Sequence, residues 1–368
     1  MLLRGLFWGA LGALAWTHAG YPLAAGLAAR LRPRPVRRDP SAEPRVTVVV
    51  AAHDEDSVIE RRLENLLALD YPPERLEIVV ASDASADRTD QLVEAVAARE
   101  PRVRLLRCPR GGKVAAQNRA VARSDAEVVA FSDANATWAP DALRHLVASL
   151  ADPEVAYVCG QLRLEAAEGS NQEGLYWRFE TWLREQESAL GSITGGNGSI
   201  YALRRADYVD VDPRFGHDLA FPYLMVQRGR RAVYEPAAHA FERPTPSNET
   251  EYRRKVRMFE HCWLITLRGG MLRRLPPGYL VSIVSHRVLR YASGVLHVVL
   301  LGTSALLLGA GAVYTLVFLA QAALLAAAAA GVPVARYVVY VTWATVVALR
   351  NYLLRGVPAT WEAAEGTR

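Results

Sequence analysis

The hydrophobic pattern divides the chain into three parts. Apolar segments at 2–31 and 291–354 flank a middle part in which short apolar runs alternate with stretches of helical periodicity. The first segment holds about 25 residues between Arg4 and Arg30, enough to cross a hydrocarbon core of about 30 Å. A signal peptide is the alternative, but the run is long for one. We therefore expect a membrane-spanning helix at the N-terminus.

The middle part predicts a sheet with both faces covered, because parallel strands buried on both faces appear as continuous apolar runs. The predicted strands are 45–52, 76–81, 102–106, 127–132, 155–164, 199–203 and 231–236. The predicted helices are 58–69, 87–99, 113–123, 140–150, 172–190, a segment reaching about residue 228, and 252–267. This alternation favours an α/β fold with an open, mostly parallel, doubly wound sheet.

The last part of the chain predicts further membrane segments. Residues 271–290 form a basic amphipathic stretch that suits a helix lying in the membrane interface. Apolar runs follow at 292–308, 312–330 and 334–354, which we interpret as two to three transmembrane or re-entrant helices. The resulting division is a transmembrane helix (1–31), a basic proline-rich linker (32–44), a cytoplasmic domain (45–270), the interfacial helix (271–290), membrane helices (291–354) and a tail (355–368).

Charge and cysteine content narrow the class of protein. The net charge is +5, and much of the positive excess lies beside apolar segments, as in the arginines that follow residue 29. By the positive-inside rule this flank faces the cytoplasm. The pattern fits membrane lipids or a phosphate-bearing ligand, and we expect no nucleic-acid partner. The three cysteines show no metal-binding spacing, which indicates a reduced compartment.

Polar residues follow several predicted strands directly. The run 128–132 ends in Asp133-Ala134-Asn135, and the run 76–81 leads into the polar turn 82–89. Ligands of open α/β sheets bind at the carboxyl ends of the strands. Two side-chain oxygens at such an end suit Mg²⁺ or Mn²⁺. A strand-ending turn is the alternative, since Asp and Asn are common in turns.

Two later features leave alternatives open. Tyr176, Trp177, Phe179 and Trp182 share one predicted helix, where aromatic residues at this spacing form either core or a platform for a sugar ring. Gly195-Gly196-Asn197-Gly198 is a flexible turn that either serves the chain reversal or lets the backbone approach a ligand.

Seven short stretches, in the expected order, resemble glycosyltransferase family 2, the membrane-bound inverting enzymes of the GT-A fold. They are 48–56, 82–89, 112–118, 131–136 followed by Pro140-Asp141-Ala142-Leu143, 186–204, Asp218 and 254–258. Single matches of this kind are weak, whereas seven in order strongly favour the family.

The resemblance implies a role for each matching residue. Asp133 and Asn135 would hold the metal, and Asp218 would be the catalytic base. Residues implied in nucleotide binding are Ala52, His53, Glu55, Asp83, Lys113, Asn118, Asp133 and Arg257. Residues implied on the acceptor side are Gly196, Asn197, Trp182 and His217. Without the resemblance, Lys113 is equally well a surface lysine, and Asp218 a helix N-cap.

The sequence departs from the family at four positions. Ser82 and Asn135 each replace a carboxylate, His217 replaces the acid before the base, and Met258 replaces the tryptophan of processive members. A histidine beside Asp218 would raise or lower the pKa of that base, depending on its own charge. Met258 weakens the case for polymer synthesis.

The expected function is therefore a metal-dependent (Mn²⁺ or Mg²⁺) hexosyltransferase in the cell inner membrane. It would move a sugar from a nucleotide sugar, with UDP favoured, to a lipid-linked or polysaccharide acceptor in envelope or exopolysaccharide assembly. A processive polysaccharide synthase, a nucleotidyltransferase and a degenerate membrane scaffold are the alternatives. The replacements at Ser82, Asn135 and His217 are the support for a scaffold.

Overall fold

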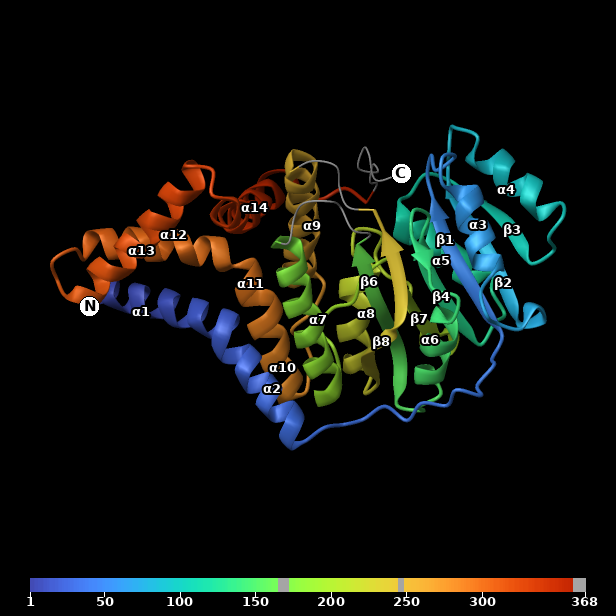
Figure 1. The fold of residues 1–368 in the computed structure, drawn as a ribbon, viewed down its shortest axis with the longest axis horizontal. Helices are drawn as coiled ribbons and strands as arrows, with labels where there is room; N and C mark the ends of the chain where they lie inside the picture. The colour runs from blue at the N-terminus through green and yellow to red at the C-terminus, as the bar shows by residue number, and fades with distance from the viewer. Residues whose placement is uncertain (165–171, 244–247, 360–368) are drawn as a thin grey trace. The chain divides into compact units, whose positions relative to one another are not determined.

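A computed structural model describes residues 1–164, 172–243 and 248–359. The chain divides into two compact units. The sheet unit comprises Ala29–Pro246 with the short stretches Arg273–Leu275 and Pro358–Arg368. The helical unit comprises Met1–Ala28, Ser247–Leu272 and Pro276–Val357. Figure 1 shows the sheet and the helices of both units.

The sheet unit is built on eight strands in the order β3-β2-β1-β4-β7-β6-β8-β5. Their bounds are β1 Val46–Ala52, β2 Leu76–Asp83, β3 Val103–Cys108, β4 Val128–Asp133, β5 Thr137–Trp138, β6 Val155–Leu164, β7 Tyr201–Arg204 and β8 Arg231–Glu242. The pairs β3–β2, β2–β1, β1–β4 and β6–β8 are parallel. The pairs of β7 with β4 and β6, and of β5 with β8, are antiparallel. The predicted open α/β sheet is confirmed.

Helices alternate with these strands. They are α3 Ile59–Leu67, α4 Thr89–Ala97, α5 Lys113–Ala122, α6 Ala142–Leu150, α7 Gln172–Leu190 and α8 His217–Gln227, with short 3₁₀ turns at Pro73–Arg75 and Arg205–Asp207. In α3 the side chains of Ile59, Leu63 and Leu66 share one face and are fully buried. They belong to the same core cluster as Val48 and Val50 of β1. This helical spacing of apolar residues is why α3 packs onto the sheet.

Two elements differ from the sequence expectation. Strand β8 is twice as long as the predicted run 231–236, since it continues to Glu242. The short strand β5 was not predicted at all. Both differences have one cause: Thr137 and Trp138 pair with Phe241 and Ala240, and β6 pairs with the same end of β8. A pairing between residues about 100 positions apart leaves no local pattern in the sequence.

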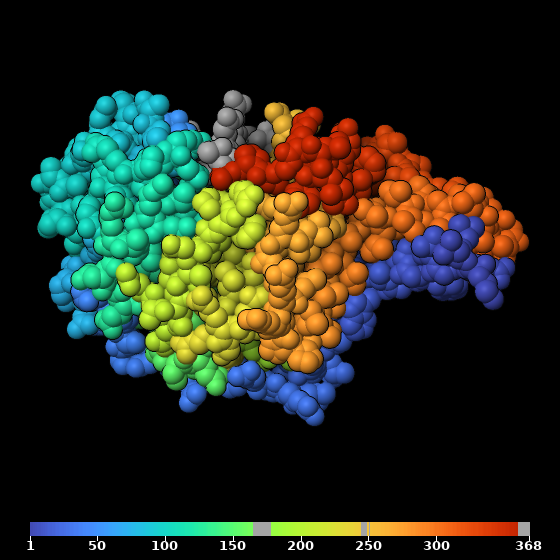
Figure 2. Space-filling view, turned by 180° about the vertical axis from the view of Figure 1, so that it is seen from behind, coloured from blue at the N-terminus to red at the C-terminus, as the bar shows by residue number. Residues whose placement is uncertain are grey.

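The helical unit contains apolar helices from both ends of the chain. They are α1 Leu2–Ala15, α2 Tyr21–Leu31 (which continues into the sheet unit), α9 Asn248–Arg268, α10 Pro277–Ile283, α11 Leu289–Tyr291, α12 Ser293–Leu306, α13 Ala312–Ala329 and α14 Pro333–Arg355, with π-helical turns at Trp16–Gly20 and Val284–Val288. Phe7 and Leu14 of α1 share a core cluster with Leu300 and Tyr314. Figure 2 shows α1 (dark blue) beside the orange helices α12 and α13.

Two helices of the described chain, α13 and α14, are long and apolar enough to cross a membrane. A third span arises if the stretch Pro277–Tyr291 and α12, which meet at an angle of 65°, count as one bent span. The predicted interfacial helix and the first predicted C-terminal span together form this bent pair. The N-terminal apolar segment is divided by the π-helical turn at Trp16–Gly20, and its role as a span stays a prediction. Leu316 and Leu319 of α13 are more than half exposed, an apolar surface of the kind that faces lipid.

Candidate active site

The polar loops predicted to share one edge of the sheet do so. Strand β1 pairs in parallel with β2 and β4, so that Ala52 lies opposite Ser82, and Ala51 lies opposite Asp133. The three strands therefore end at the same edge. This edge is where an open α/β sheet binds ligands.

Asp133, the last residue of β4, forms an ion pair with Lys113. The side chains are 28% and 25% exposed, so the pair is accessible from solvent. Burial by itself lowers the pKa of Lys113, but the negative charges of Asp133, Asp218 and Glu242 outweigh this effect, and the pKa is raised. Lys113 therefore stays charged, with three carboxylates around it.

Gly198 brings the backbone of a second loop up to this ion pair. A Cβ at Gly198 would lie 3.3 Å from Lys113 Nζ and 3.6 Å from Asp133 Oδ2. Any larger side chain there would fill the space beside the carboxylate. The glycine-rich turn therefore brings its backbone close to the Lys113–Asp133 pair, and its approach to a ligand stays a prediction.

Asp218 lies in the first turn of α8. The residue at the N-cap is Gly216, so the interpretation of Asp218 as the N-cap is wrong. The backbone carbonyl of Asp218 accepts a 2.7 Å hydrogen bond from the N–H of Gly196. The side chain is partly exposed, and its charge acts on Lys113. The hydrogen bond from Gly196 ties the start of α8 to the glycine-rich loop whose Gly198 lies against the Lys113–Asp133 pair.

His217 is an interior residue. It is 4% exposed, and its Nδ1 lies 2.9 Å from the hydroxyl of Tyr201. Burial, with the charge of Lys113 as a smaller contribution, lowers the pKa of His217 to about 3. The neutral ring therefore puts no charge beside Asp218 at neutral pH. A direct contact with an acceptor does not fit this position, which leaves His217 a positioning role.

The next two predicted acceptor-side residues hold the loop that leads to Gly198. Asn197 is 8% exposed; its Nδ2 donates to the carbonyl of Gly160, and its Oδ1 accepts from the N–H groups of Ser199 and Ile200. Gly196 faces Tyr157, whose hydroxyl oxygen would lie 2.1 Å from a Cβ at position 196. Both residues fix the loop through these contacts, and their place on the acceptor side stays a prediction.

Asp83 anchors the loop before Lys113. Its carboxylate accepts hydrogen bonds from the N–H groups of Gly111 (2.7 Å) and Gly112 (2.9 Å), and from Arg110 at 2.5 Å. Asp83 is 2% exposed. A direct hydrogen bond to a nucleotide base stays a prediction, and the observed bonds give Asp83 a role in positioning Lys113.

Asn118 connects α5 to the segment that precedes α8. Its Nδ2 donates to the carbonyl of Val211 at 2.9 Å, and its Oδ1 accepts from the hydroxyl of Tyr208 at 2.6 Å. These bonds stabilise the chain leading to His217 and Asp218, a structural role for a residue that we expected to bind nucleotide.

The residues predicted from the first loop also lie at this edge. Ala52 is buried at the end of β1, and the side chain of His53 is 18% exposed. The N–H of Glu55 donates to Thr89 Oγ1 at 2.8 Å, which ties the first loop to the turn after β2. Asp54, between them, accepts from the N–H of Ala86. The two loops therefore form one wall of the site.

Trp182 and Arg257 lie on long helices and not in the loops at the carboxyl ends of the strands. Trp182 lies on α7, is 38% exposed and packs its ring 6.3 Å from that of Phe179. The side chains of Tyr176 and Trp177 lie outside the described residues. Arg257 lies on α9 in the helical unit, so its predicted contact with the nucleotide stays a prediction.

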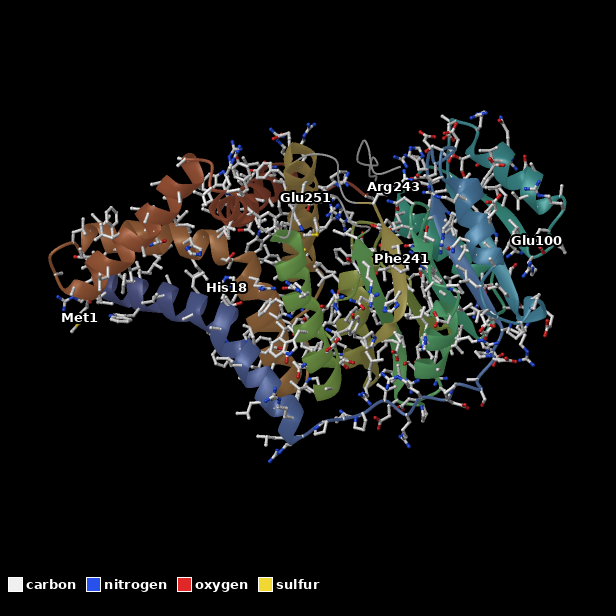
Figure 3. All side chains as sticks on the ribbon, in the orientation of Figure 1. Met1, His18, Glu100, Phe241, Arg243 and Glu251 are labelled. Atoms are coloured by element: carbon white, nitrogen blue, oxygen red, sulfur yellow. The ribbon has the colours of Figure 1, made fainter. Side chains whose placement is uncertain are left out.

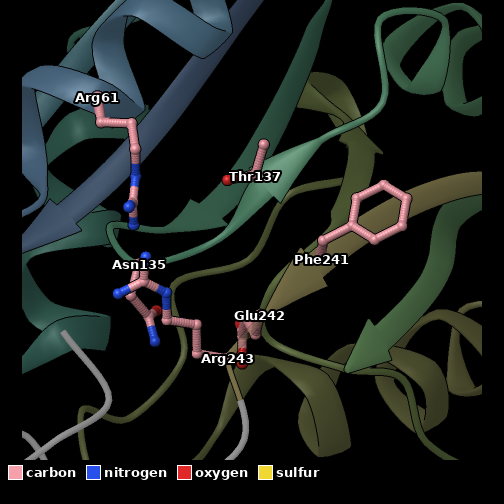
Figure 4. Close-up of a pocket in the computed structure, with 6 residues that line it drawn as sticks. All are labelled: Arg61, Asn135, Thr137, Phe241, Glu242 and Arg243. Carbon is pink, nitrogen blue, oxygen red and sulfur yellow. The ribbon is translucent and has the colours of Figure 1, made fainter. Parts of the chain in front are cut away.

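A pocket of about 100 Å³ opens beside Asn135. Its lining residues are Arg61, Asn135, Thr137, Phe241, Glu242 and Arg243. Figure 4 shows the side chains of Arg61 and Arg243 reaching toward Asn135. Figure 3 places Phe241 and Arg243 at the end of β8. Sequence analysis missed Glu242 and Arg243, because only the pairing of β5 with β8 brings the end of β8 to the turn after β4. It also missed Arg61, which lies on α3.

Arg62, the neighbour of Arg61 on α3, is a buried cation. Arg62 is 1% exposed, stacks 5.1 Å from the ring of Trp138 and donates to Asn65. Burial lowers the pKa of Arg62 to about 9, and the charges of Asp133 and Glu242 oppose this shift. Arg62 therefore stays protonated at neutral pH. It adds a second positive charge to the group of carboxylates around Lys113.

The oxygen atoms at this edge suit a divalent cation. Within 1–164, 172–243 and 248–359 no cluster of three or more His, Cys, Asp or Glu residues has metal-binding geometry. Asp133 is nevertheless accessible and already has a cation, the ammonium group of Lys113, against its carboxylate. Asn135 lines the adjoining pocket. Carboxylate and amide oxygens, completed by water and phosphate, are the ligands that Mg²⁺ and Mn²⁺ prefer.

Comparison with known proteins identifies the class as glycosyltransferase. The family described as "Glycosyl transferase family 2" matches residues 47–211. The match to glycosyltransferase family 2 covers less than half of the chain, and the sheet is that of the GT-A fold.

Among solved structures, the chain is similar to the mannosyltransferase PcManGT from Pyrobaculum calidifontis in complex with GDP-Man and Mn²⁺. The TM-score is 0.73 at 26% identity, over 96% of this chain and 99% of that one. Among curated proteins, it is 29% identical over 178 residues to the beta-monoglucosyldiacylglycerol synthase of Synechocystis sp., covering 45% of this chain and 36% of that protein. It is 25% identical over 206 residues to the poly-beta-1,6-N-acetyl-D-glucosamine synthase of Staphylococcus aureus, covering 52% and 48%. These matches span less than half the length of the curated relatives.

Proposed function

We propose that the chain is a membrane-associated, metal-dependent, inverting glycosyltransferase that moves a sugar from a nucleotide sugar to a membrane lipid or lipid-linked glycan. The observation that carries the proposal is the grouping of Asp133, Lys113 and Asp218 at the carboxyl edge of a GT-A sheet. The apolar helices α13 and α14 support membrane association.

The leaving group of such a transfer is a nucleoside diphosphate, which develops negative charge as the glycosidic bond breaks. Asp133 and Asn135 would hold the cation, with Mn²⁺ supported by the similar mannosyltransferase. When bound, a divalent cation supplies Lewis-acid stabilisation of the diphosphate. Lys113 lies against Asp133, and it would add a charge-assisted hydrogen bond to a phosphate oxygen.

The acceptor hydroxyl must lose a proton as it attacks. Asp218 would take this proton as the general base, a role typically worth about 10²–10⁴-fold in rate. Attack from the side opposite the leaving diphosphate inverts the anomeric centre. Asp218 keeps its position through the hydrogen bond from Gly196 to its carbonyl and through the packing of His217.

The donor base is the least constrained part of the proposal. The resemblance of Asp83 to a base-binding aspartate favours UDP. However, the carboxylate of Asp83 already accepts hydrogen bonds from Arg110 and from the N–H groups of Gly111 and Gly112. The similar mannosyltransferase was solved with GDP-Man. We retain UDP as the first candidate and GDP as the second.

The similar glucosyldiacylglycerol synthase supports a lipid acceptor, and the similar poly-N-acetylglucosamine synthase supports a polysaccharide acceptor. Met258 in place of the tryptophan of processive enzymes favours transfer of a single sugar. We propose a multi-pass protein of the inner membrane with the sheet unit in the cytoplasm, since the arginines after residue 29 fit the positive-inside rule.

The test is nucleoside diphosphate release by the detergent-purified protein with Mn²⁺ or Mg²⁺, across UDP- and GDP-sugars, with and without diacylglycerol or polyprenyl phosphate. The proposal is supported if nucleoside diphosphate release depends on the metal, on one nucleotide sugar and on a lipid acceptor. The release should also be lost in Asp133→Asn. A wild-type protein that binds neither nucleotide nor metal would instead favour the membrane scaffold.

A further inference from the structure

The predicted metal site is one carboxylate short, because Asn135 stands where the family keeps a second aspartate. An amide oxygen binds a divalent cation more weakly than a carboxylate, since it carries no negative charge. A chain with this replacement needs another negative charge near Asp133 if it is to hold the cation as firmly. The structure contains such a charge in Glu242, the last residue of β8.

Glu242 ends β8 beside the turn that carries Asp133 and Asn135. Thr137 of β5 pairs with Phe241, and Glu242 is the next residue along β8. Glu242 and Asn135 line the same pocket, and Figure 4 shows the side chain of Arg243 between them in this view. Glu242 is therefore close to the position from which the second aspartate is missing.

The negative charges of Glu242 and Asp133 act on the same two cations, Lys113 and Arg62. Lys113 and Arg62 each interact with both carboxylates, Lys113 from the start of α5 and Arg62 from α3. The backbone at Gly198 lies against Asp133, and the hydroxyl of the next residue, Ser199, donates to Glu242 Oε1. The loop 198–199 thus links the two carboxylates and fixes the rotamer of Glu242.

We propose that Glu242 supplies the second negative charge of the divalent-cation site and compensates for Asn135. This inference rests on the proposed function, in which Asp133 holds a divalent cation beside the nucleoside diphosphate. Glu242 acts either as a direct oxygen ligand or through a water molecule of the cation. Its negative charge adds to that of Asp133, and the same charge also acts on the ammonium group of Lys113.

A purely structural role for Glu242 makes a different prediction. If Glu242 serves only to fasten the loop at Ser199, its charge is unimportant and its hydrogen bond is essential. Glu242→Gln removes the charge and retains an oxygen that accepts from Ser199. Ser199→Ala removes the hydrogen bond and retains the charge. These two variants therefore separate the two roles.

The experiment is a titration of the detergent-purified full chain with Mn²⁺, followed by electron paramagnetic resonance of free Mn²⁺, at saturating UDP and separately at saturating GDP. Glu242→Gln should weaken Mn²⁺ binding by about 10–100-fold, the range for loss of a supporting carboxylate at a metal site. Ser199→Ala keeps the charge of Glu242 and should weaken Mn²⁺ binding less than Glu242→Gln does. Glu94→Gln, on α4, is the matched control and should bind as wild type does.

A compensating pair gives the sharper result. Asn135→Asp should tighten Mn²⁺ binding, and the double variant Asn135→Asp/Glu242→Gln should return to near the wild-type affinity, because it again has two carboxylates. Circular dichroism and the thermal midpoint show whether each variant is folded, and Glu242→Asp, which keeps the charge, should bind better than Glu242→Gln.

Wild-type affinity in Glu242→Gln, or an equal loss in Ser199→Ala, overturns the inference. If Asp133→Asn loses Mn²⁺ while Glu242→Gln retains it, the proposed function survives and only the role of Glu242 fails. If the wild-type chain binds no Mn²⁺ under either condition, both fail together.

Discussion

Replacing Gly196 by alanine tests whether the tight approach of the glycine-rich loop to β6 positions the catalytic aspartate. A Cβ at Gly196 would lie 2.1 Å from the hydroxyl oxygen of Tyr157, far inside van der Waals contact, and 3.2 Å from Cys159 Sγ. Tyr157 is fully buried, so its ring has no open space to move into. The same glycine donates its N–H to the carbonyl of Asp218. The substitution therefore strains the core and moves the base.

The expected cost is about 1–3 kcal/mol, the usual range for an added methyl group in a packed interior. For a domain of this size, each kcal/mol lowers the thermal midpoint by about 2–4 °C. Transfer activity should fall further than stability requires at the assay temperature, because displacement of Asp218 by about 1 Å costs on the order of 10²-fold in rate.

Tyr157→Phe supplies the compensating change. It removes the atom that clashes, and the hydroxyl has no hydrogen-bond partner within the described residues beyond the neighbouring Cys159 thiol. The single variant should therefore have near-wild-type stability. The double variant Gly196→Ala/Tyr157→Phe should recover most of the thermal midpoint, since its closest remaining contacts would be about 3.2 Å.

The assay combines thermal unfolding of the four proteins in detergent with nucleoside diphosphate release. A double variant as unstable as Gly196→Ala would show that the Tyr157 hydroxyl is not the obstacle. A Gly196→Ala protein with wild-type stability and turnover would refute the close approach itself, and with it the proposed positioning of Asp218.

Three further predictions concern the site. Asp218→Asn should lower transfer by about 10²–10⁴-fold while nucleotide affinity, measured by calorimetry, stays near wild type; normal turnover would remove Asp218 from the mechanism. Lys113→Ala should raise the KM for the donor more than Lys113→Arg does, because only the arginine keeps a cation beside Asp133; equal KM values would make Lys113 a surface lysine. His217 has a folded-state pKa of about 3, below its unfolded value of 6.5, so the unfolded chain binds the extra proton. Its contribution to stability is present above pH 6.5 and is lost as the pH falls from 6.5 toward 3, by about 2 kcal/mol at pH 5. The variant His217→Gln should have a flatter dependence of the thermal midpoint between pH 7 and pH 5, and an unchanged slope would contradict the assignment of His217 as a buried neutral ring.

Several site residues could be predicted because their chemistry follows a strand directly. Asp133 ends a run of buried apolar residues, and the parallel pairing of β1 with β4 brings the turn at Asp133 to the same edge as Ala52. The sequence order of the motifs then suggested Lys113, which forms an ion pair with Asp133, and Asp218, whose backbone bonds to the glycine-rich loop beside that pair. Local pattern suffices in these cases because each residue lies at the end of an element that the pattern itself defines.

For other predicted residues the structure shows contacts within the protein, and their predicted roles toward ligands stay predictions. His217 was expected on the acceptor side, yet an aromatic interior that includes Tyr201 and Phe221 surrounds it. Asn118 and Asn197 were expected to face ligands, yet their amides bond to the backbone. A polar side chain shows no preference in sequence between a ligand and a buried backbone group, because both satisfy its hydrogen bonds equally.

The sequence by itself determined the alternation of buried strands and helices, the apolar helices and the carboxylate at the end of β4, since each follows from a periodicity or a run within a few residues. The tertiary structure alone decided which distant segments share the site. Glu242 lies about 100 residues from Asn135 in sequence, and only the pairing of β5 with β8 brings the two into one pocket. The charge balance around Asp133 was likewise settled by packing, because Arg62 is buried on α3 and Lys113 forms its ion pair with Asp133 from α5.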